Sequence, residues 1–239
     1  MDIRQLLEKI LPAERIKTRQ IDLLSYASDA GFYQLIPKAV VQPMSVEEVK
    51  SLFRFSKKKN IPIVFRTGGT SLSGQSITDG ILVDLSQHWK AISVGKDGKS
   101  VTVQPGITGA MVNNYLKQYH SKIGPDPSSI NAAMMGGIIS NNSSGMCCGV
   151  AYNSYHTLQS VRFVLADGSE YNTAVQNDYT RFVWEQKNLA DTLSSLRRQV
   201  LGNEFLNNRI RNVPNVDALG GSPELTGTGR AGPWCRRRA

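Results

Sequence analysis

A strand–helix–strand pattern near the start of the chain limits the folds that it can adopt. Residues 39–41 (Ala-Val-Val) and 61–65 (Ile-Pro-Ile-Val-Phe) are short apolar runs of the kind found in strands. Between them, Ser45 stands three residues before Glu48, which predicts a capping box, and apolar residues recur at helical spacing over 46–53. Because a helical connection joins strands that run parallel, we expect a βαβ unit whose two strands are parallel.

More strands are predicted after this unit. Residues 81–85 form an apolar run typical of a buried strand, and residues 92–94 and 101–103 flank a polar turn, as in a hairpin. A second hairpin is predicted over 161–173, where Asp167-Gly168 supplies the turn. The chain therefore has enough strands for more than one small sheet.

Helices and an irregular tail account for much of the rest. The apolar residues between positions 6 and 11 form one helical face at the N-terminus, and Thr108 is placed to cap a second helix. A third helix is predicted over 189–201, with Gly202 as its stop. Residues 212–239 show no apolar period and are rich in Gly and Pro, so we expect an irregular tail.

Composition excludes several classes of protein. Of 239 residues, 40% are apolar and 20% charged, as in ordinary globular proteins, and no apolar run is long enough to span a membrane. The net charge is +9, but much of the excess lies in the last ten residues, so we expect no specific nucleic-acid binding. Cys147, Cys148 and Cys235 lack the spacing of a zinc site or an ordinary disulfide, so we expect small, buried, reduced thiols and no metal.

A glycine-rich loop follows the second strand of the βαβ unit. The segment Arg66–Ser76, RTGGTSLSGQS, combines glycines and hydroxyl side chains and has no acidic residue. Glycines let the backbone approach a ligand closely, and successive N–H groups in such a turn bind anions. The loop therefore favours a phosphate or pyrophosphate, with Arg66 either contacting it or bracing the loop. The alternative is a long polar turn between two strands.

A second cluster of small and polar residues spans 125–145. Gly136 and Gly137 permit close backbone approach, and the neighbouring Ser and Asn side chains supply neutral donors and acceptors. This chemistry suits a large, neutral, polar heteroaromatic ligand better than a metal ion. The alternative is a tightly packed helix of small residues with polar turns.

Six motifs then occur in a fixed order: YASDAGFYQLIPKAVVQPMSVEEV, RTGGTSLSGQS, VTVQPGIT, GPDPSS, MMGGIISNNSSGM and VLADGSEYNT. Together they resemble the FAD-binding domain of the vanillyl-alcohol oxidase and p-cresol methylhydroxylase (PCMH) flavoprotein superfamily. Within it they resemble the FAD-linked D-lactate dehydrogenase and glycolate oxidase branch. The resemblance covers about residues 25–175.

The resemblance implies which residues hold the cofactor. The loop would hold the pyrophosphate of FAD, and the second cluster would line the rest. The residues so implied are Arg66, Thr67, Gly68, Gly69, Thr70, Ser71, Leu72, Ser73, Gly74, Gln75, Pro127, Ser128, Ser129, Met135, Gly136, Gly137, Asn141, Ser144 and Gly145. Some relatives attach the flavin through a histidine, but none of His88, His120 and His156 lies in such a pattern, so we expect non-covalent FAD.

The family fold implies an α+β protein with two α/β subdomains of the PCMH type and FAD between them. The division expected here is an N-terminal helical segment (1–35), the FAD-binding domain (36–175, with subdomains of about 36–90 and 91–175), a helical start of a cap region (176–211) and an irregular tail (212–239).

The implied reaction is oxidation of a D-2-hydroxy acid, D-lactate-like, by hydride transfer to FAD, with electrons then passing to a separate acceptor. Family members continue through a cap that carries the substrate arginines and the catalytic histidine. We therefore assign no catalytic residue here, and we expect this chain to be incomplete and inactive alone. The expected location is the cytoplasm, with contact at the inner face of the membrane left open. The alternatives are a non-catalytic flavin-binding module and a basic nucleic-acid-associated protein.

Overall fold

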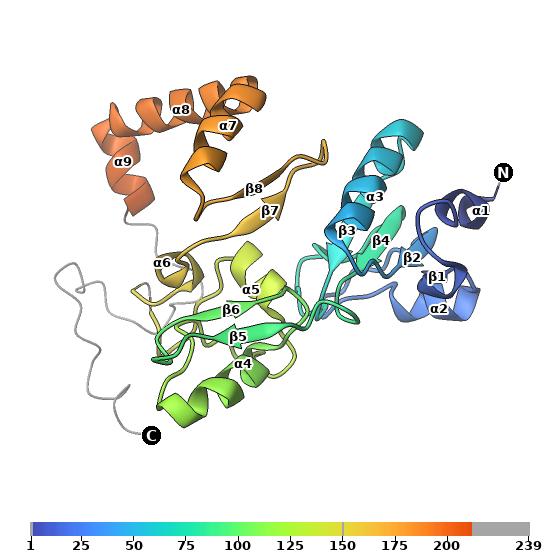
Figure 1. The fold of residues 1–239 in the computed structure, drawn as a ribbon, viewed down its shortest axis with the longest axis horizontal. Helices are drawn as coiled ribbons and strands as arrows, with labels where there is room; N and C mark the ends of the chain where they lie inside the picture. Colours follow the sequence, from blue (N-terminus) through green and yellow to red (C-terminus); the bar gives the residue numbers. More distant parts are fainter. Residues whose placement is uncertain (1, 150, 212–239) are drawn as a thin grey trace.

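The computed structural model describes residues 2–149 and 151–211 as helices and small sheets arranged along the chain (Figure 1). A four-stranded sheet comes first, two hairpins follow, and three helices end the described part. No helix in these residues is long and apolar enough to cross a membrane. The tail expected over 212–239, with Cys235 and its arginines, lies outside the described residues.

The four-stranded sheet contains the expected βαβ unit. Its order is β1-β2-β4-β3, where β1 (Ile16–Lys17) is antiparallel to β2 (Ala39–Val41). Strands β2 and β3 (Ile63–Arg66) both run parallel to β4 (Ile81–Asp84), which lies between them. The connecting helix, α3, covers Val46–Lys59. The two predicted strands are thus parallel, and a third strand separates them.

Capping and charge explain where α3 begins and ends. The Ser45 hydroxyl accepts a hydrogen bond from the Glu48 N–H at 3.3 Å, as predicted. The Glu48 carboxylate reaches the N–H of Met44 at 2.7 Å, one residue earlier than in the usual capping box. Three lysines complete the last turn, where the helix dipole favours positive charge, and Asn60 ends the helix in a left-handed conformation.

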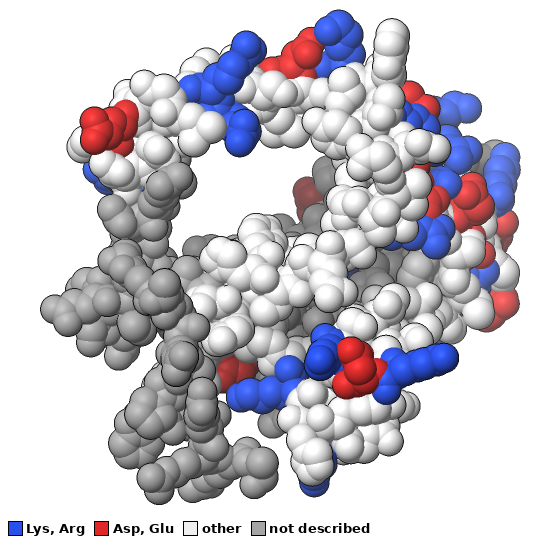
Figure 2. Space-filling model, turned by 60° about the vertical axis from the view of Figure 1, so that its left-hand side comes forward, with Lys and Arg blue, Asp and Glu red and all other residues white. Residues whose placement is uncertain are grey.

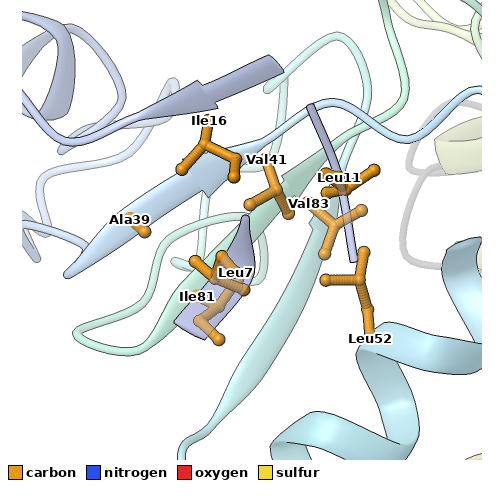
Figure 3. Close-up of a cluster of buried hydrophobic side chains, with 8 residues drawn as sticks. All are labelled: Leu7, Leu11, Ile16, Ala39, Val41, Leu52, Ile81 and Val83. Carbon is orange, nitrogen blue, oxygen red and sulfur yellow. The ribbon is translucent and has the colours of Figure 1, made fainter. Parts of the chain in front are cut away.

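One hydrophobic core fills the space between this sheet and the helices beside it (Figure 3). Side chains from α1 and the turn after it, from three strands and from α3 point toward one another there: Leu7, Leu11, Ile16, Ala39, Val41, Leu52, Ile81 and Val83. Helix α1 covers only Ile3–Leu7, so the helix expected through position 11 is shorter. The chain continues through η1 (Ala13–Arg15) and α2 (Gln20–Ser25).

The second half of the predicted domain has a separate core. The predicted hairpin of β5 (Ile92–Val94) and β6 (Val101–Val103) is present, and α4 (Gly109–Leu116) and α5 (Met135–Ser140) share one hydrophobic cluster with it (Figure 1). Thr108 caps α4, as predicted, and η2 (Lys117–Tyr119) follows that helix. The core residues are Ile107, Val112, Leu116, Ala133, Met135 and Ile138.

The last described part consists of a hairpin and helices. Strands β7 and β8 form the predicted second hairpin, and the helix expected over 189–201 is present and starts two residues earlier. The elements are α6 (Ser154–Thr157), β7 (Arg162–Val164), β8 (Glu170–Asn172), α7 (Gln176–Glu185), α8 (Lys187–Leu201) and α9 (Glu204–Arg211). Figure 2 shows one face on which lysines and arginines are interspersed with aspartates and glutamates rather than gathered in a stripe of one sign.

Candidate functional site

The glycine-rich loop offers a run of unused backbone donors. It begins where β3 ends, at the carboxyl edge of the parallel strands. Within the described residues, the N–H groups from Gly68 to Leu72 donate no hydrogen bond. Gly69 and Gly74 have φ values of 63° and 77°, in the left-handed region that favours glycine. Unpaired successive N–H groups beside an acid-free stretch form a site for an anion such as pyrophosphate.

The structure brings the second predicted cluster against this loop. A Cβ on Gly68 would lie 2.3 Å from the carbonyl oxygen of Ala132, so the two backbones touch there. A Cβ on Gly137 would lie 3.6 Å from the Thr67 hydroxyl oxygen. The glycine-rich loop and the second cluster, which are far apart in sequence, are therefore in contact with each other.

The two adjacent glycines of α5 have different surroundings. A Cβ on Gly136 would lie 2.7 Å from the Cβ of Pro105, so Gly136 is required for packing. Outside its own helix, the Thr67 hydroxyl oxygen is the one atom of the described residues that a Cβ on Gly137 would meet within 4 Å, at an ordinary contact distance. Gly137 thus leaves space open beside the loop, where a ligand has room to lie.

The other predicted residues of the second cluster have mixed environments. Ser128 and Ser129 are exposed, and the Ser129 carbonyl accepts hydrogen bonds from the N–H groups of Ala132 and Ala133. Met135 is buried in the second core, and its N–H donates to Ile107. Pro127 is half-buried, and Asn141 is exposed at the end of α5. Ser144 is buried, and Gly145 lies directly against Asp126.

In the loop itself, Ser71 organises the turn. Its hydroxyl accepts hydrogen bonds from the N–H groups of Ser73 and Gln75, each at 3.3 Å, and bonds to the Gln75 side chain. Leu72 and Ser73 are exposed at the tip. This turn keeps the chain compact while leaving the preceding N–H groups unpaired.

Arg66 braces the loop. Its Nη1 donates to the carbonyl oxygens of Ser28 at 2.7 Å and Tyr26 at 3.2 Å, and its guanidinium lies 5.6 Å from the centre of the Tyr26 ring. The two hydrogen bonds and the contact with the Tyr26 ring tie the end of β3 to the end of α2 and the segment after it. Of the two roles predicted for Arg66, the geometry matches bracing.

Sequence reasoning missed a buried carboxylate beneath the loop. Asp84, at the end of β4, accepts hydrogen bonds from Tyr26 Oη (2.8 Å), Gln42 Nε2 (2.9 Å) and the N–H and hydroxyl of Ser86 (2.8 and 2.6 Å). Burial and the neighbouring Asp84 raise the pKa of the Tyr26 hydroxyl to about 12. The sequence did contain a signal for Asp84, because this residue is an acid at the end of an otherwise apolar strand.

A cavity beside α3 and the cysteine Cys148 are not part of this site. A cavity of 570 Å³ is lined by ion-paired side chains of α3, β8 and α7, among them Lys50 and Glu170, and no predicted cofactor residue lines it. Cys148 is buried as predicted, and this burial raises the pKa of its thiol. The prediction is wrong for Cys147, which is exposed. Among the described residues, no group of metal-ligating side chains is present.

The comparison with protein families gives the chain its class. Residues 37–174, more than half of the chain, match the model of the FAD binding domain, and the chain belongs to this family. The resemblance stated from the six motifs is therefore confirmed, and FAD is the cofactor. The geometry fits it, since the unpaired N–H groups suit a pyrophosphate and Gly137 leaves room beside them.

Two curated proteins with similar sequences show which FAD-binding proteins the chain resembles. D-2-hydroxyglutarate dehydrogenase of Haemophilus influenzae is 35% identical over 170 residues, which are 68% of this chain and 16% of that protein. Glycolate oxidase subunit GlcD of Escherichia coli is 26% identical over 165 residues, 68% of this chain and 33% of that protein. The chain thus spans well under half the length of these relatives.

Solved structures confirm the fold. p-Cresol methylhydroxylase matches 72% of this chain and 35% of its own, with a TM-score of 0.61 and 19% identity. Chitooligosaccharide oxidase matches 77% of this chain and 39% of its own, with a TM-score of 0.62 and 16% identity. The α+β, PCMH-type fold expected from the sequence is therefore present.

Proposed function

We propose that this chain binds FAD non-covalently and forms the flavin-binding part of a dehydrogenase that oxidises a D-2-hydroxy acid. The observation that carries the proposal is the run of N–H groups from Gly68 to Leu72 that donate no hydrogen bond within the described residues, next to Thr67, which borders the space at Gly137. We assign the FAD-binding domain to residues 36–175, with subdomains of about 36–90 and 91–175. Residues 176–211 would begin a cap region.

The residues of this chain would bind and orient the cofactor. Backbone N–H groups of the loop would donate to the pyrophosphate oxygens, and no acidic side chain within the loop opposes them. Gly137 would allow the cofactor to lie close to α5, and Thr67 would face it across the same gap. Bound FAD supplies the hydride acceptor of the reaction.

The substrate class rests on the relatives. The relatives' names refer to D-2-hydroxyglutarate and glycolate, which share a hydroxyl on the carbon next to a carboxylate. We propose a D-lactate-like acid with this group as substrate, a separate electron acceptor, and a cytoplasmic location, with or without contact at the membrane.

The alternative is a flavin-binding module without catalysis. It is favoured by the loop from Thr67 to Ser76, which contains no acid–base side chain that would take a proton from a substrate hydroxyl. Both proposals require FAD binding, and they differ in whether substrate reduces the flavin.

The experiment uses the purified chain with added FAD. A flavin absorption spectrum that persists after gel filtration, and that is lost on denaturation, supports non-covalent binding; a chain that retains no flavin contradicts the proposal. D-Lactate, D-2-hydroxyglutarate and glycolate are then added one at a time under anaerobic conditions, with no other electron acceptor present. Bleaching of the flavin by one of these acids supports the dehydrogenase, whereas binding without bleaching supports the module.

A further inference from the structure

The carboxyl ends of the three parallel strands form a polar row below the glycine-rich loop. Arg66 of β3 is paired in register with Asp84 of β4, and Gln42 follows the paired residue Val41 of β2. Tyr26, at the end of α2, adds its hydroxyl to the same row. Asp84 is 1% exposed, and the Tyr26, Gln42 and Ser86 donors fill both of its oxygens.

This row is connected to the loop at two points. The Tyr26 hydroxyl donates a hydrogen bond to Asp84, and the Tyr26 carbonyl oxygen accepts one from Arg66. Tyr26 therefore bonds to the ends of both β4 and β3. Four residues further along, the N–H of Ala30 donates to the carbonyl oxygen of Ser71 at 3.0 Å. Segment 26–30 is therefore fixed to the sheet by Asp84 and to the middle of the loop by Ser71.

The guanidinium of Arg66 also sets the position of Gly69. A Cβ built on Gly69 would lie 2.5 Å from Arg66 Nη2, so the loop backbone rests directly on this side chain. If Tyr26 moved, Arg66 would lose both a carbonyl acceptor and the ring beneath it. The loop would then lose its support at Gly69.

We propose that Asp84 is a positioning residue that, through the Tyr26 hydroxyl, holds Arg66 and segment 26–30 so that the N–H groups of the loop stay arranged for pyrophosphate. This inference rests on the proposed function, because it assigns a role to Asp84 in forming that same site. Asp84 does not touch the cofactor in this account. A loop held in its binding conformation before the ligand arrives avoids the entropy loss of ordering it on binding.

The test removes one hydroxyl. Tyr26→Phe deletes the bond to Asp84 and keeps the ring under Arg66. The matched control is Tyr171→Phe, because the Tyr171 hydroxyl donates to Glu185 at the same 2.8 Å and lies on β8, away from the loop. We expect FAD affinity to fall about tenfold in Tyr26→Phe and to stay within twofold of the unchanged chain in Tyr171→Phe.

A second readout needs no flavin. Backbone ¹⁵N order parameters of residues 68–72 in the FAD-free protein should fall in Tyr26→Phe and stay unchanged in Tyr171→Phe. Asp84→Asn, which keeps the size of the side chain and removes its charge, should lower them further. Unchanged order parameters in both Tyr26→Phe and Asp84→Asn would overturn the inference. If the unchanged chain binds no FAD, the proposed function fails, and the order parameters still decide whether Asp84 positions the loop.

Discussion

The four-stranded region (residues 16–90) and the two-hairpin region (residues 91–175) bury their strands differently. All four residues of β4 are buried, because β2 and β3 flank it and side chains pack on both faces. In β5 and β6, burial alternates between half-buried and exposed, and no residue of either strand is fully buried. A strand enclosed on both faces is fixed by its core, whereas a two-stranded hairpin depends on a single face.

The comparison bears on the candidate site because each region supplies one side of it. The loop with unpaired N–H groups extends from the enclosed sheet, and Gly137 belongs to a helix of the hairpin region. We infer that the sheet side is the more rigid of the two. Substitutions that probe the two regions in matched pairs test this difference.

The largest difference is expected for core truncations. Leu82→Ala, at a fully buried position of β4, should lower the free energy of unfolding by about 3–4 kcal/mol, because it removes the transfer energy of the side chain and leaves a cavity. Val103→Ala, at a half-buried position of β6, should lower it by about 1 kcal/mol. Urea unfolding measures both, and equal losses would contradict the difference in enclosure.

The next pair of substitutions, at Gly136 and Gly137, distinguishes a glycine needed for packing from a glycine that leaves room for the cofactor. Gly136→Ala should lower the free energy of unfolding by about 2 kcal/mol, since its methyl group would meet Pro105. Gly137→Ala should leave the FAD-free protein unchanged or more stable by about 0.5 kcal/mol, because alanine favours the helix, while weakening FAD binding. Thermal unfolding and flavin titration distinguish the two. If Gly137→Ala binds FAD normally, the space at Gly137 is not used by the cofactor.

These pairs also show what the sequence could and could not predict. The elements of the βαβ unit, both hairpins and the Ser45 and Thr108 caps were predictable, since each element has a signal in its own short stretch of sequence. The contact between Gly68 and Ala132 depends on how two regions meet, and the residues alone predicted only that both segments were suited to a ligand. The FAD assignment came from the order of six motifs rather than from local physics.

The residues that sequence reasoning missed lie far apart along the chain. Tyr26 and Asp84 are separated by 58 positions, and neither has a local pattern that marks it as a partner of the other. The distinct roles of Gly136 and Gly137 depend on Pro105, which contacts one and not the other. The N-terminal helix ends at Leu7 although apolar spacing continues to Leu11, and Leu11 still reaches the core from the turn after the helix.

A smaller change in the free energy of unfolding is expected at an ion pair that joins η1 to the four-stranded region. Arg15 donates to both oxygens of Glu48, at 2.6 and 2.7 Å, and joins the chain before β1 to α3. These bonds lower the pKa of the Glu48 carboxyl, so its contribution is present above the ordinary glutamate pKa and is lost as the pH falls through the lowered value. Glu48→Gln should cost about 1.5 kcal/mol at pH 7 and progressively less under acidic conditions.

Urea unfolding of Glu48→Gln and the unchanged chain at pH 7 and pH 3 measures this difference. The control is Asp191→Asn, which removes an exposed ion pair with Lys187 on α8 and should cost less than about 0.5 kcal/mol at either pH. A constant difference across pH for Glu48→Gln would mean that the charge of Glu48 does not stabilise the region.

The smallest loss in the free energy of unfolding is expected on removing a helix cap, and this loss should be the same in both regions. The Ser45 hydroxyl accepts the N–H of Glu48 at 3.3 Å, and the Thr108 hydroxyl accepts the N–H of Met111 at 3.2 Å. Both bonds satisfy a donor in the first turn of a helix, so Ser45→Ala and Thr108→Ala should each lower the free energy of unfolding by about 1 kcal/mol. Because a cap acts within one turn, the enclosure of the neighbouring strands should not change its value. Chemical unfolding of the two variants measures both losses, and a loss at Ser45 more than twice that at Thr108 would show that the enclosed core strengthens the cap as well.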